Sequence, residues 1–280
     1  MEASNNFKPI IIKDVITEKS PGVAKVLPKF VFRYIHRIMH IDFINEIFQK
    51  FGHLRGIDFV NGIVTDFNVT EKIYGLDNIP ENGKFIFAAN HPLGGFDGMV
   101  LMKAVYNKLG MLKFLANDVM MNITNLHEVF VPLNKHGGNS REVAKAVNDM
   151  YLSDDQVLIF PSGYASRKIK GKVIDLEWQK HFVAKSIEFK RDVIPVFIGG
   201  NNSNRFYNIA KLRKFLRIRW NLEMFFLADE TYKHRNKDVT IYFGNPIPFS
   251  TFDKSKSHKQ WAQFVKDFIY TLPKSERIDN

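Results

Sequence analysis

From residue 66 to the C-terminus, short apolar segments alternate with segments that we predict to be helices. The apolar segments 84–89, 156–160 and 193–198 have the length and content of buried strands. Helices are predicted between them, for example over 98–109. This alternation is typical of an α/β domain in which helices cover both faces of a sheet. We therefore predict an α/β fold with a mixed, mostly parallel sheet flanked by helices.

The first 65 residues have a different pattern, which is helical. In the segment 29–40, apolar residues recur at helical spacing and basic residues share another side. A second segment, 42–51, begins at a capping aspartate and ends before a glycine. Two interpretations remain open: an amphipathic pair packed on the core, or an interfacial segment resting on a membrane. We divide the chain into an N-terminal helical extension, 1–65, and an α/β domain, 66–280.

Composition and charge restrict the chemistry. The chain has no cysteine, which excludes disulfides, thiolate metal sites and a cysteine nucleophile. Its 40 lysine and arginine residues exceed its 29 aspartate and glutamate residues, for a net charge of +11. Such an excess suits nucleic acid, an anionic membrane surface or an acidic substrate. The sequence contains no recognised nucleic-acid-binding motif, so only the charge supports binding to nucleic acid. We therefore expect no nucleic-acid partner. We also expect neither a signal peptide nor a transmembrane helix.

The stretch FIFAANHPLGGFDG, residues 85–98, holds the most informative side chains. A buried strand ends there, and a loop carries His91 and Asp97 into the next predicted helix. Ligands bind at the carboxyl ends of strands in open α/β sheets. A histidine there is suited to be a general base, and a nearby carboxylate is suited to orient it. The N–H groups of Gly94 and Gly95 are candidates to stabilise an oxyanion.

A plainer interpretation of the same loop stays open. Asp97 could be no more than the N-cap of the helix, and the two glycines could simply make the turn. A histidine and an aspartate often lie near each other without sharing a function. The spacing of these residues does not by itself decide between the two interpretations.

Three further stretches follow the same arrangement of a strand and then a polar loop. They are VFVPLNK (129–135), with GGNSR close behind it, IFPSGYASRK (159–168), and VIPVFIGG (193–200). In this order, the four stretches resemble the glycerolipid acyltransferase superfamily, which includes glycerol-3-phosphate and lysophosphatidic acid acyltransferases. The resemblance covers roughly residues 66–250. The form NHPxGGxDG is similar to a bacterial subgroup that includes lyso-aminolipid O-acyltransferases and proteins labelled haemolysins.

The sequence also departs from the superfamily pattern. The spacing from His91 to Asp97 is one residue longer, Ser162 stands where glutamate is usual, and the basic residues of the third block come late. These blocks bind the acceptor in the family, so the departures concern the acceptor more than the reaction. The resemblance makes the following residues candidates for substrate binding: Asn90, Gly94, Gly95, Asn134, Lys135, Arg141, Ser162, Gly163, Arg167 and Lys168.

The resemblance implies a reaction as well. His91 is expected to take a proton from the hydroxyl of a lysolipid, and Asp97 to orient His91. The hydroxyl then attacks an acyl thioester on acyl carrier protein or coenzyme A, with no metal and no other cofactor. We expect a peripheral enzyme on the cytoplasmic side of the inner membrane of a bacterium, bound to an anionic membrane surface. The alternatives are a thioester hydrolase and a catalytically inactive lipid- or membrane-binding protein of the same fold.

Overall fold

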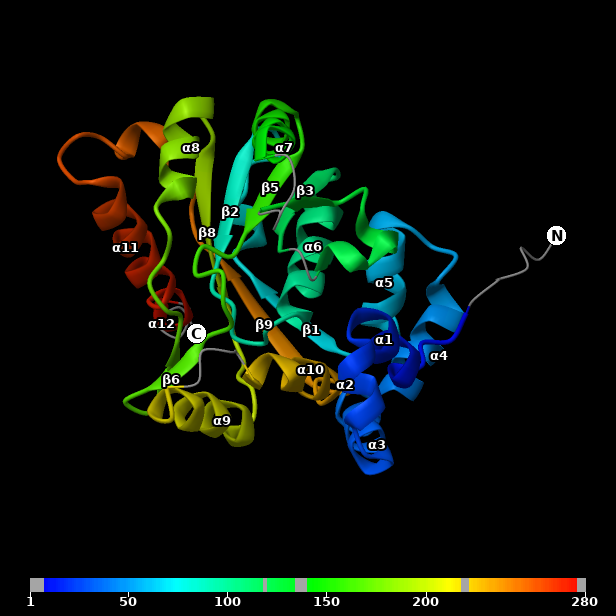
Figure 1. Ribbon diagram of the computed structural model, residues 1–280. Helices are drawn as coiled ribbons and strands as arrows, with labels where there is room; N and C mark the ends of the chain where they lie inside the picture. The colour runs from blue at the N-terminus through cyan, green and yellow to red at the C-terminus, as the bar shows by residue number, and fades with distance from the viewer. Residues whose placement is uncertain (1–7, 118–119, 134–139, 218–221, 276–280) are drawn as a thin grey trace.

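The centre of the protein is a seven-stranded sheet, seen in a computed structural model that describes residues 8–117, 120–133, 140–217 and 222–275 (Figure 1). Its strand order is β1–β9–β8–β2–β5–β3–β4. Neighbouring strands run parallel except β8 and β9, which are antiparallel. The predicted mixed, mostly parallel sheet is therefore confirmed. The strands are β1 Thr70–Tyr74, β2 Phe85–Ala89, β3 Leu112–Ala116, β4 Phe130–Pro132, β5 Gln156–Ile159, β8 Asp192–Ile198 and β9 Asp238–Phe243.

Strand β2 shows why a continuous apolar segment forms the centre of the sheet. All five of its residues are buried. Phe85, Phe87 and Ala89 pack into one apolar cluster, and Ile86 and Ala88 into another. Successive side chains of a strand point to opposite faces, so a strand covered on both faces must be apolar throughout.

Helices cover both faces of the sheet. Helices α5 and α6 contribute to the apolar cluster on one face, and α7, α8 and α11 to the cluster on the other. Helix α8 begins at residue 181, and residues 175–180 before it form a loop that carries a buried aspartate. These helices are α5 Gly56–Asp66, α6 Phe96–Leu109, α7 Ser140–Leu152, α8 His181–Phe189 and α11 His258–Ile269; the short α12 is Leu272–Ser275.

The N-terminal residues are helical, as predicted. Helix α5 places Phe59 and Val60 in the core, whereas α3 has no buried residue. Helix α4 buries Ile41 and Ile47, and α1 buries Ile12, so α2 and α3 are the least buried of the N-terminal helices. The first four helices are α1 Ile12–Lys19, α2 Pro21–Val26, α3 Lys29–Ile38 and α4 Ile41–Phe51.

Two insertions near the carboxyl ends of the strands complete the fold. One is the hairpin of β6 (Arg167–Ile169) and β7 (Lys172–Ile174), which the sequence analysis did not predict. The other follows β8 and consists of α9 (Asn204–Phe215), the 3₁₀ helix η4 (Leu222–Phe226) and α10 (Leu227–Tyr232). A small apolar cluster of Ala165, Phe206 and Tyr207, against which Val173 of β7 packs, joins the two insertions.

Candidate active site

The loop that follows β2 is tied to the neighbouring strand by the side chain of Asn90. Its Nδ2 donates to the carbonyl oxygen of Ile198 over 2.9 Å, and its Oδ1 accepts from the Ile198 N–H over 2.6 Å. The amide of Asn90 is buried and continues the pairing of β2 and β8 by one step. Asn90 therefore holds the loop that begins with His91, and both of its polar atoms are engaged in doing so.

His91 and Asp97 lie together at the start of α6. Nδ1 of His91 is 3.0 Å from Oδ2 of Asp97, which is completely buried. The Asp97 carboxylate also accepts hydrogen bonds from main-chain N–H groups at the helix N-terminus, where a negative charge is stabilised. The donors are Leu93 (2.8 Å), Gly94 (3.2 Å), Gly95 (3.1 Å) and Gly98 (3.0 Å).

The two side chains shift each other's pKa. Burial would lower the pKa of His91, but the charge and hydrogen bond of Asp97 outweigh burial and raise it above its ordinary 6.5. Burial would raise the pKa of Asp97, but His91 and the main-chain donors hold it below its ordinary value. The pair is therefore a charged carboxylate beside an imidazole whose affinity for a proton is enhanced.

The other edge of the His91 ring is available for chemistry. The ring stacks on Phe160 with centroids 4.1 Å apart, and its side chain is 16% exposed. Among the residues that the structure describes, none hydrogen-bonds to Nε2. With Nδ1 bound to the carboxylate, Nε2 is the atom that a neutral His91 offers as a proton acceptor.

Asp175 supports the His91 loop from the far side, and the sequence analysis missed this role. Asp175 lies in the loop that precedes α8. Oδ1 of Asp175 accepts from the His91 N–H over 3.2 Å and from the Ser166 hydroxyl, while Oδ2 accepts from Trp178 Nε1 over 2.8 Å. Burial raises the pKa of Asp175 against these hydrogen bonds. The Ser166 N–H also donates to the His91 carbonyl over 2.7 Å, so the two loops are joined at this point.

The two glycines of the loop differ from their predicted role. Their N–H groups donate to Asp97, so in this structure they are not free to stabilise an oxyanion. Gly94 has φ of +75°, and a Cβ there would lie 2.4 Å from Cδ2 of Leu227. Any other residue there would be strained at this φ and would require the Leu227 side chain to shift. The glycines instead make the tight turn that brings Asp97 back to His91.

The third block surrounds the same site but uses its polar groups internally. Ser162 is buried and donates to the carbonyl oxygen of Tyr164 over 2.7 Å, which shapes the loop. Gly163 has φ of +65° and faces open space. Lys168 donates to the side chain of Asn204 over 2.9 Å and so links β6 to α9.

Arg167 was predicted to bind an anionic group, and the structure gives it a buried partner. Its Nη2 lies 2.9 Å from Oε1 of Glu223, whose Oε2 lies 2.8 Å from Nε of Arg213. Glu223 is completely buried. The Arg167 guanidinium also lies near enough to His91 to oppose the rise in the His91 pKa. An anion that approached His91 would therefore meet a cationic group whose charge Glu223 already offsets in part.

The remaining candidate residues belong to the stretch from the end of β4 to the first turn of α7. Arg141 is exposed in the first turn of α7 and, among the described residues, forms no hydrogen bond or ion pair with the His91 loop. Asn134 and Lys135 lie outside the described residues, so the structure does not place them.

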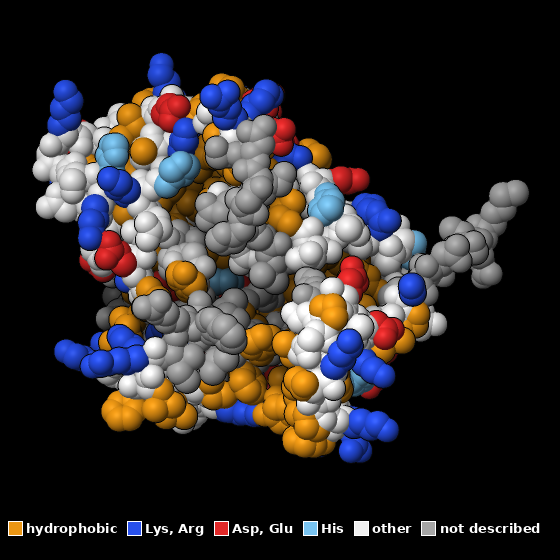
Figure 2. Space-filling view, viewed as in Figure 1, with side chains coloured by type: hydrophobic (Ala, Val, Ile, Leu, Met, Phe, Trp, Pro, Cys, Tyr) orange, Lys and Arg blue, Asp and Glu red, His pale blue; other side chains and the backbone are white. Residues whose placement is uncertain are grey.

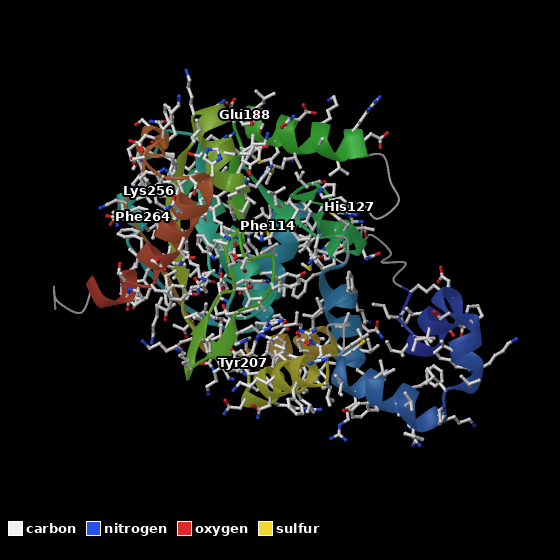
Figure 3. All side chains as sticks on the ribbon, turned by 60° about the vertical axis from the view of Figure 1, so that its left-hand side comes forward. Phe114, His127, Glu188, Tyr207, Lys256 and Phe264 are labelled. Carbon is white, nitrogen blue, oxygen red and sulfur yellow. The ribbon has the colours of Figure 1, made fainter. Side chains whose placement is uncertain are left out.

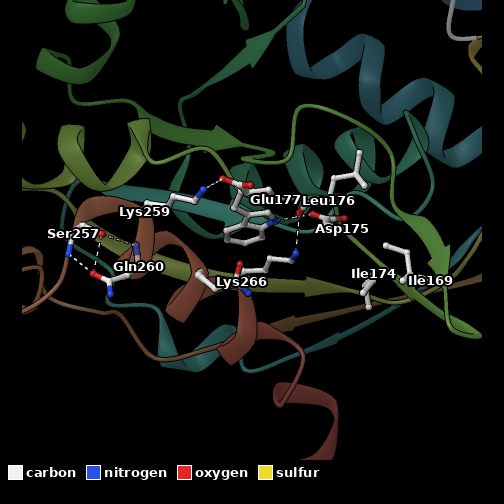
Figure 4. Close-up of a pocket in the computed structure, with 11 residues that line it drawn as sticks. Ile169, Ile174, Asp175, Leu176, Glu177, Ser257, Lys259, Gln260 and Lys266 are labelled. Atoms are coloured by element: carbon white, nitrogen blue, oxygen red, sulfur yellow. Dashed lines mark hydrogen bonds and ion pairs between the residues drawn. The ribbon is translucent and has the colours of Figure 1, made fainter. Parts of the chain in front are cut away.

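A groove of about 510 Å³ adjoins the site through Asp175 (Figure 4). It lies between the β6–β7 hairpin, the loop around Trp178 and helix α11, and His91 is not among its lining residues. Ile169 and Ile174 give it an apolar wall. Two lysines at its edge are already engaged: Lys259 lies 2.7 Å from Glu177, and Lys266 donates to the Leu176 carbonyl over 2.9 Å.

Comparison with known proteins gives consistent results. A family model described as acyltransferase matches residues 14–278. A lyso-glycine lipid O-acyltransferase of Bacteroides thetaiotaomicron is 42% identical over 264 residues, which are 94% of this chain and 97% of that protein. A protein of the same name from Phocaeicola vulgatus is 42% identical over 266 residues, 94% of this chain and 95% of its own.

One solved structure is also similar. It is the 1-acyl-sn-glycerophosphate (LPA) acyltransferase PlsC of Thermotoga maritima, with a TM-score of 0.46 and 15% identity. The match covers 86% of this chain and 95% of that one. In the part of this chain that the structure describes, every helix is too short or too polar to cross a bilayer.

Proposed function

This chain belongs to the acyltransferase family, and we propose that it transfers a fatty acyl group from a thioester to the hydroxyl of a lysolipid. The two curated relatives are named for a lyso-glycine lipid and match nearly the whole chain. Their names favour a lyso-aminolipid as the acceptor, and a lysophospholipid is the next choice. The observation that carries the mechanism is the hydrogen bond between His91 and Asp97.

In the proposed reaction, His91 is the general base. Nε2 takes the proton of the acceptor hydroxyl as its oxygen attacks the carbonyl carbon of the thioester. Asp97 keeps the Nδ1–H oriented and stabilises the imidazolium that forms. A carbon–oxygen bond forms, the carbon–sulfur bond breaks, and the thiolate leaves with the proton from His91. The raised pKa of His91 supports this role because a stronger base accepts the proton more readily.

The donor is acyl carrier protein or coenzyme A, and we place part of its arm or acyl chain in the groove beside Asp175. Two observations support that placement. The groove has an apolar wall, and Asp175 contacts the His91 main chain as well as lining it. A donor held there would lie against the loop that carries the base.

The enzyme is proposed to act as a peripheral protein on the cytoplasmic side of the inner membrane, with residues 1–65 as its helical extension. A lysolipid acceptor is dissolved in a membrane, and the net charge of +11 suits an anionic surface. Helix α3 has no buried residue, which supports a surface role for this part of the extension, whereas α4 and α5 pack against the core.

Acyl transfer by purified protein tests the proposal. Wild type and His91→Ala are supplied with labelled acyl carrier protein or labelled acyl-coenzyme A, and with lyso-glycine lipid or lysophosphatidic acid. Mass spectrometry then identifies the products. We expect diacyl product from wild type and a loss of about 10²–10⁴-fold in the variant. Equal rates from both proteins would contradict His91 as the base.

The products also separate the two alternative functions. Labelled free fatty acid without diacyl product would identify a thioester hydrolase, in which His91 activates water. Lipid binding without turnover of any donor, unchanged in His91→Ala, would identify an inactive lipid-binding protein.

A further inference from the structure

Helices α3 and α9 carry large apolar side chains that the fold leaves exposed. Figure 2 shows hydrophobic side chains gathered along the lower edge of the molecule, over α9 and α3, with lysine and arginine side chains around them. Turning the molecule by 60° keeps both helices at this edge (Figure 3). We define the α3–α9 face by its apolar members, with their exposed fractions: Val26 78%, Phe30 65%, Tyr34 53%, Leu212 57%, Phe215 82%, Leu216 55% and Phe225 62%.

Basic residues run beside the apolar ones on both helices. Along α3, Lys29, Arg33 and Arg37 are exposed and recur every four residues, so they form a row along the helix. This row is adjacent to the row of Phe30 and Tyr34, which have the same spacing. Along and just after α9, the exposed basic residues are Arg205, Lys211, Lys214 and Arg217. Neither helix contains an aspartate or a glutamate. Aromatic side chains beside lysine and arginine are typical of helices that lie in the interface of an anionic membrane.

A direct contact joins the two helices into one surface. Nη2 of Arg205, in the first turn of α9, donates to the hydroxyl of Tyr34 on α3 over 3.3 Å. The same guanidinium lies over the ring of Phe226, 4.8 Å from its centroid. Arg205 therefore fixes the N-terminal extension against the insertion that follows β8. Segments 171 residues apart in sequence are held as parts of one face.

The same insertion reaches the catalytic loop. The side chain of Leu227, at the start of α10, occupies the space beside Gly94, and Thr231 lies next to Gly95. Helix α10 follows η4 directly, and η4 carries Phe225 of the α3–α9 face. The segment formed by η4 and α10 therefore contributes Phe225 to the α3–α9 face and contacts the His91 loop through Leu227 and Thr231.

We propose that the α3–α9 face is the membrane-docking surface of this protein and that its partner is an anionic bilayer. Its phenylalanines enter the interface between head groups and acyl chains, while the basic residues beside them contact anionic head groups. Docking through this face brings the catalytic loop close to the bilayer by way of α10, so that a lysolipid reaches His91 from the membrane. This inference rests on the proposed function for the identity of the lipid, but the docking itself does not require turnover.

Vesicle sedimentation of the full chain tests the proposal. The vesicles contain phosphatidylcholine with phosphatidylglycerol, or phosphatidylcholine alone. We expect wild type to sediment with the anionic vesicles and to be released by salt. The double variant Phe30→Ser/Phe215→Ser should bind them at least about tenfold more weakly. Arg33→Gln/Lys214→Gln should weaken binding to the anionic vesicles and leave any binding to phosphatidylcholine unchanged.

A matched control uses exposed apolar residues outside the face. Met111 and Leu152 are 63% and 64% exposed, and Met111→Ser/Leu152→Ser should bind vesicles like wild type. Thermal unfolding of each variant confirms that it is folded. Equal loss in the control and face variants, or equal binding by the phenylalanine variant and wild type, would overturn the proposal. Binding of the face to acyl carrier protein with no affinity for vesicles would overturn it too.

A transfer assay with a water-soluble, short-chain lysolipid separates this inference from the proposed function. Wild type that transfers acyl groups to this acceptor but does not bind vesicles contradicts the docking surface alone. Wild type that binds vesicles through the α3–α9 face but transfers no acyl group to any acceptor contradicts the proposed function and leaves the docking surface supported.

Discussion

The carboxylate of Asp97 lies 3.0 Å from Nδ1 of His91 and binds the backbone of the loop between them at the same time. Leu93 and Gly94 donate to the same oxygen that faces His91. The turn that orients His91 is therefore built around the Asp97 carboxylate, which also raises the pKa of His91. A change at Asp97 must alter the shape of the loop as well as the electrostatics of His91.

The pH dependence of acyl transfer should follow the His91 pKa. His91 must be neutral to accept a proton, so kcat/KM should rise as the pH increases through a pKa above 6.5. In Asp97→Asn the attraction of the carboxylate is lost and burial remains, so this rise should move to lower pH. The maximal rate should fall by about 10²–10⁴-fold. Profiles measured between about pH 5 and 9 check both effects. A rise that stays at the same pH in the variant would contradict the coupling of the two residues.

The unfolding free energy of the protein should also depend on pH through the His91 pKa. The raised pKa of His91 means that the folded state binds its proton more tightly. The resulting stabilisation is fully present below the unfolded pKa of about 6.5 and is lost as the pH rises through the folded pKa. His91→Gln should therefore cost more unfolding free energy at about pH 5.5 than at about pH 9. Urea titrations at both values measure the difference, with the exposed His258→Gln as the control. An equal cost at the two values would contradict the charged pair.

The sequence was informative where the site is contiguous. His91, the glycine turn and Asp97 lie within seven consecutive positions, so a strand, a loop and a helix start could be predicted from their order. The side chain of Asn90, which the resemblance made a candidate for substrate binding, pairs with the end of β8 in the structure. Local spacing did not reveal that the glycine N–H groups bind Asp97, because their hydrogen-bond partners depend on the path of the turn.

Residues whose partners are distant in sequence were not predicted. Asp175 contacts the main chain of His91 across 84 positions, and its own neighbours resemble a helix start. Glu223 meets Arg167 across 56 positions and follows a basic stretch, so nothing local indicated that it is buried. Burial of a charge is decided by packing of the whole insertion, which a single sequence does not display.

The positive φ of Gly94 predicts a specific steric effect. Gly94→Ala and Gly163→Ala place a Cβ at similar φ, +75° and +65°, but only the first meets a neighbour, Cδ2 of Leu227 at 2.4 Å. Both should lose about 1–2 kcal/mol to backbone strain. Gly94→Ala should lose about 1–3 kcal/mol more, and Leu227→Ala in the same chain should recover part of that excess. Chemical unfolding measures all three variants. Equal costs for the two glycine variants would show that the contact with α10 is not restrictive.

Glu223 should be needed for stability because two guanidiniums share it. Glu223→Gln leaves Arg167 and Arg213 close together, 14% and 19% exposed, without a compensating charge. Removal of one partner from a buried ion pair costs about 3–5 kcal/mol. The matched control is Glu177→Gln, which breaks the exposed pair with Lys259 and should cost about 0–1 kcal/mol. Thermal and urea unfolding compare the two variants. Similar small costs would mean that water reaches the Glu223 cluster.

Filling the groove beside Asp175 should weaken binding of the acyl donor more than it slows proton transfer to His91. Ile174 lies on its apolar wall, so Ile174→Trp should fill part of it, while the exposed Lys172→Trp adds the same ring outside. We expect Ile174→Trp to raise the KM for the acyl thioester about tenfold or more, because an indole occupies space that the donor needs. The kcat should change less, since the hydrogen bond between His91 and Asp97 does not involve the groove. Steady-state kinetics with donors of several chain lengths separates the two constants, and Lys172→Trp should match wild type. An unchanged KM for every donor, in a variant that unfolds like wild type, would show that the donor binds elsewhere.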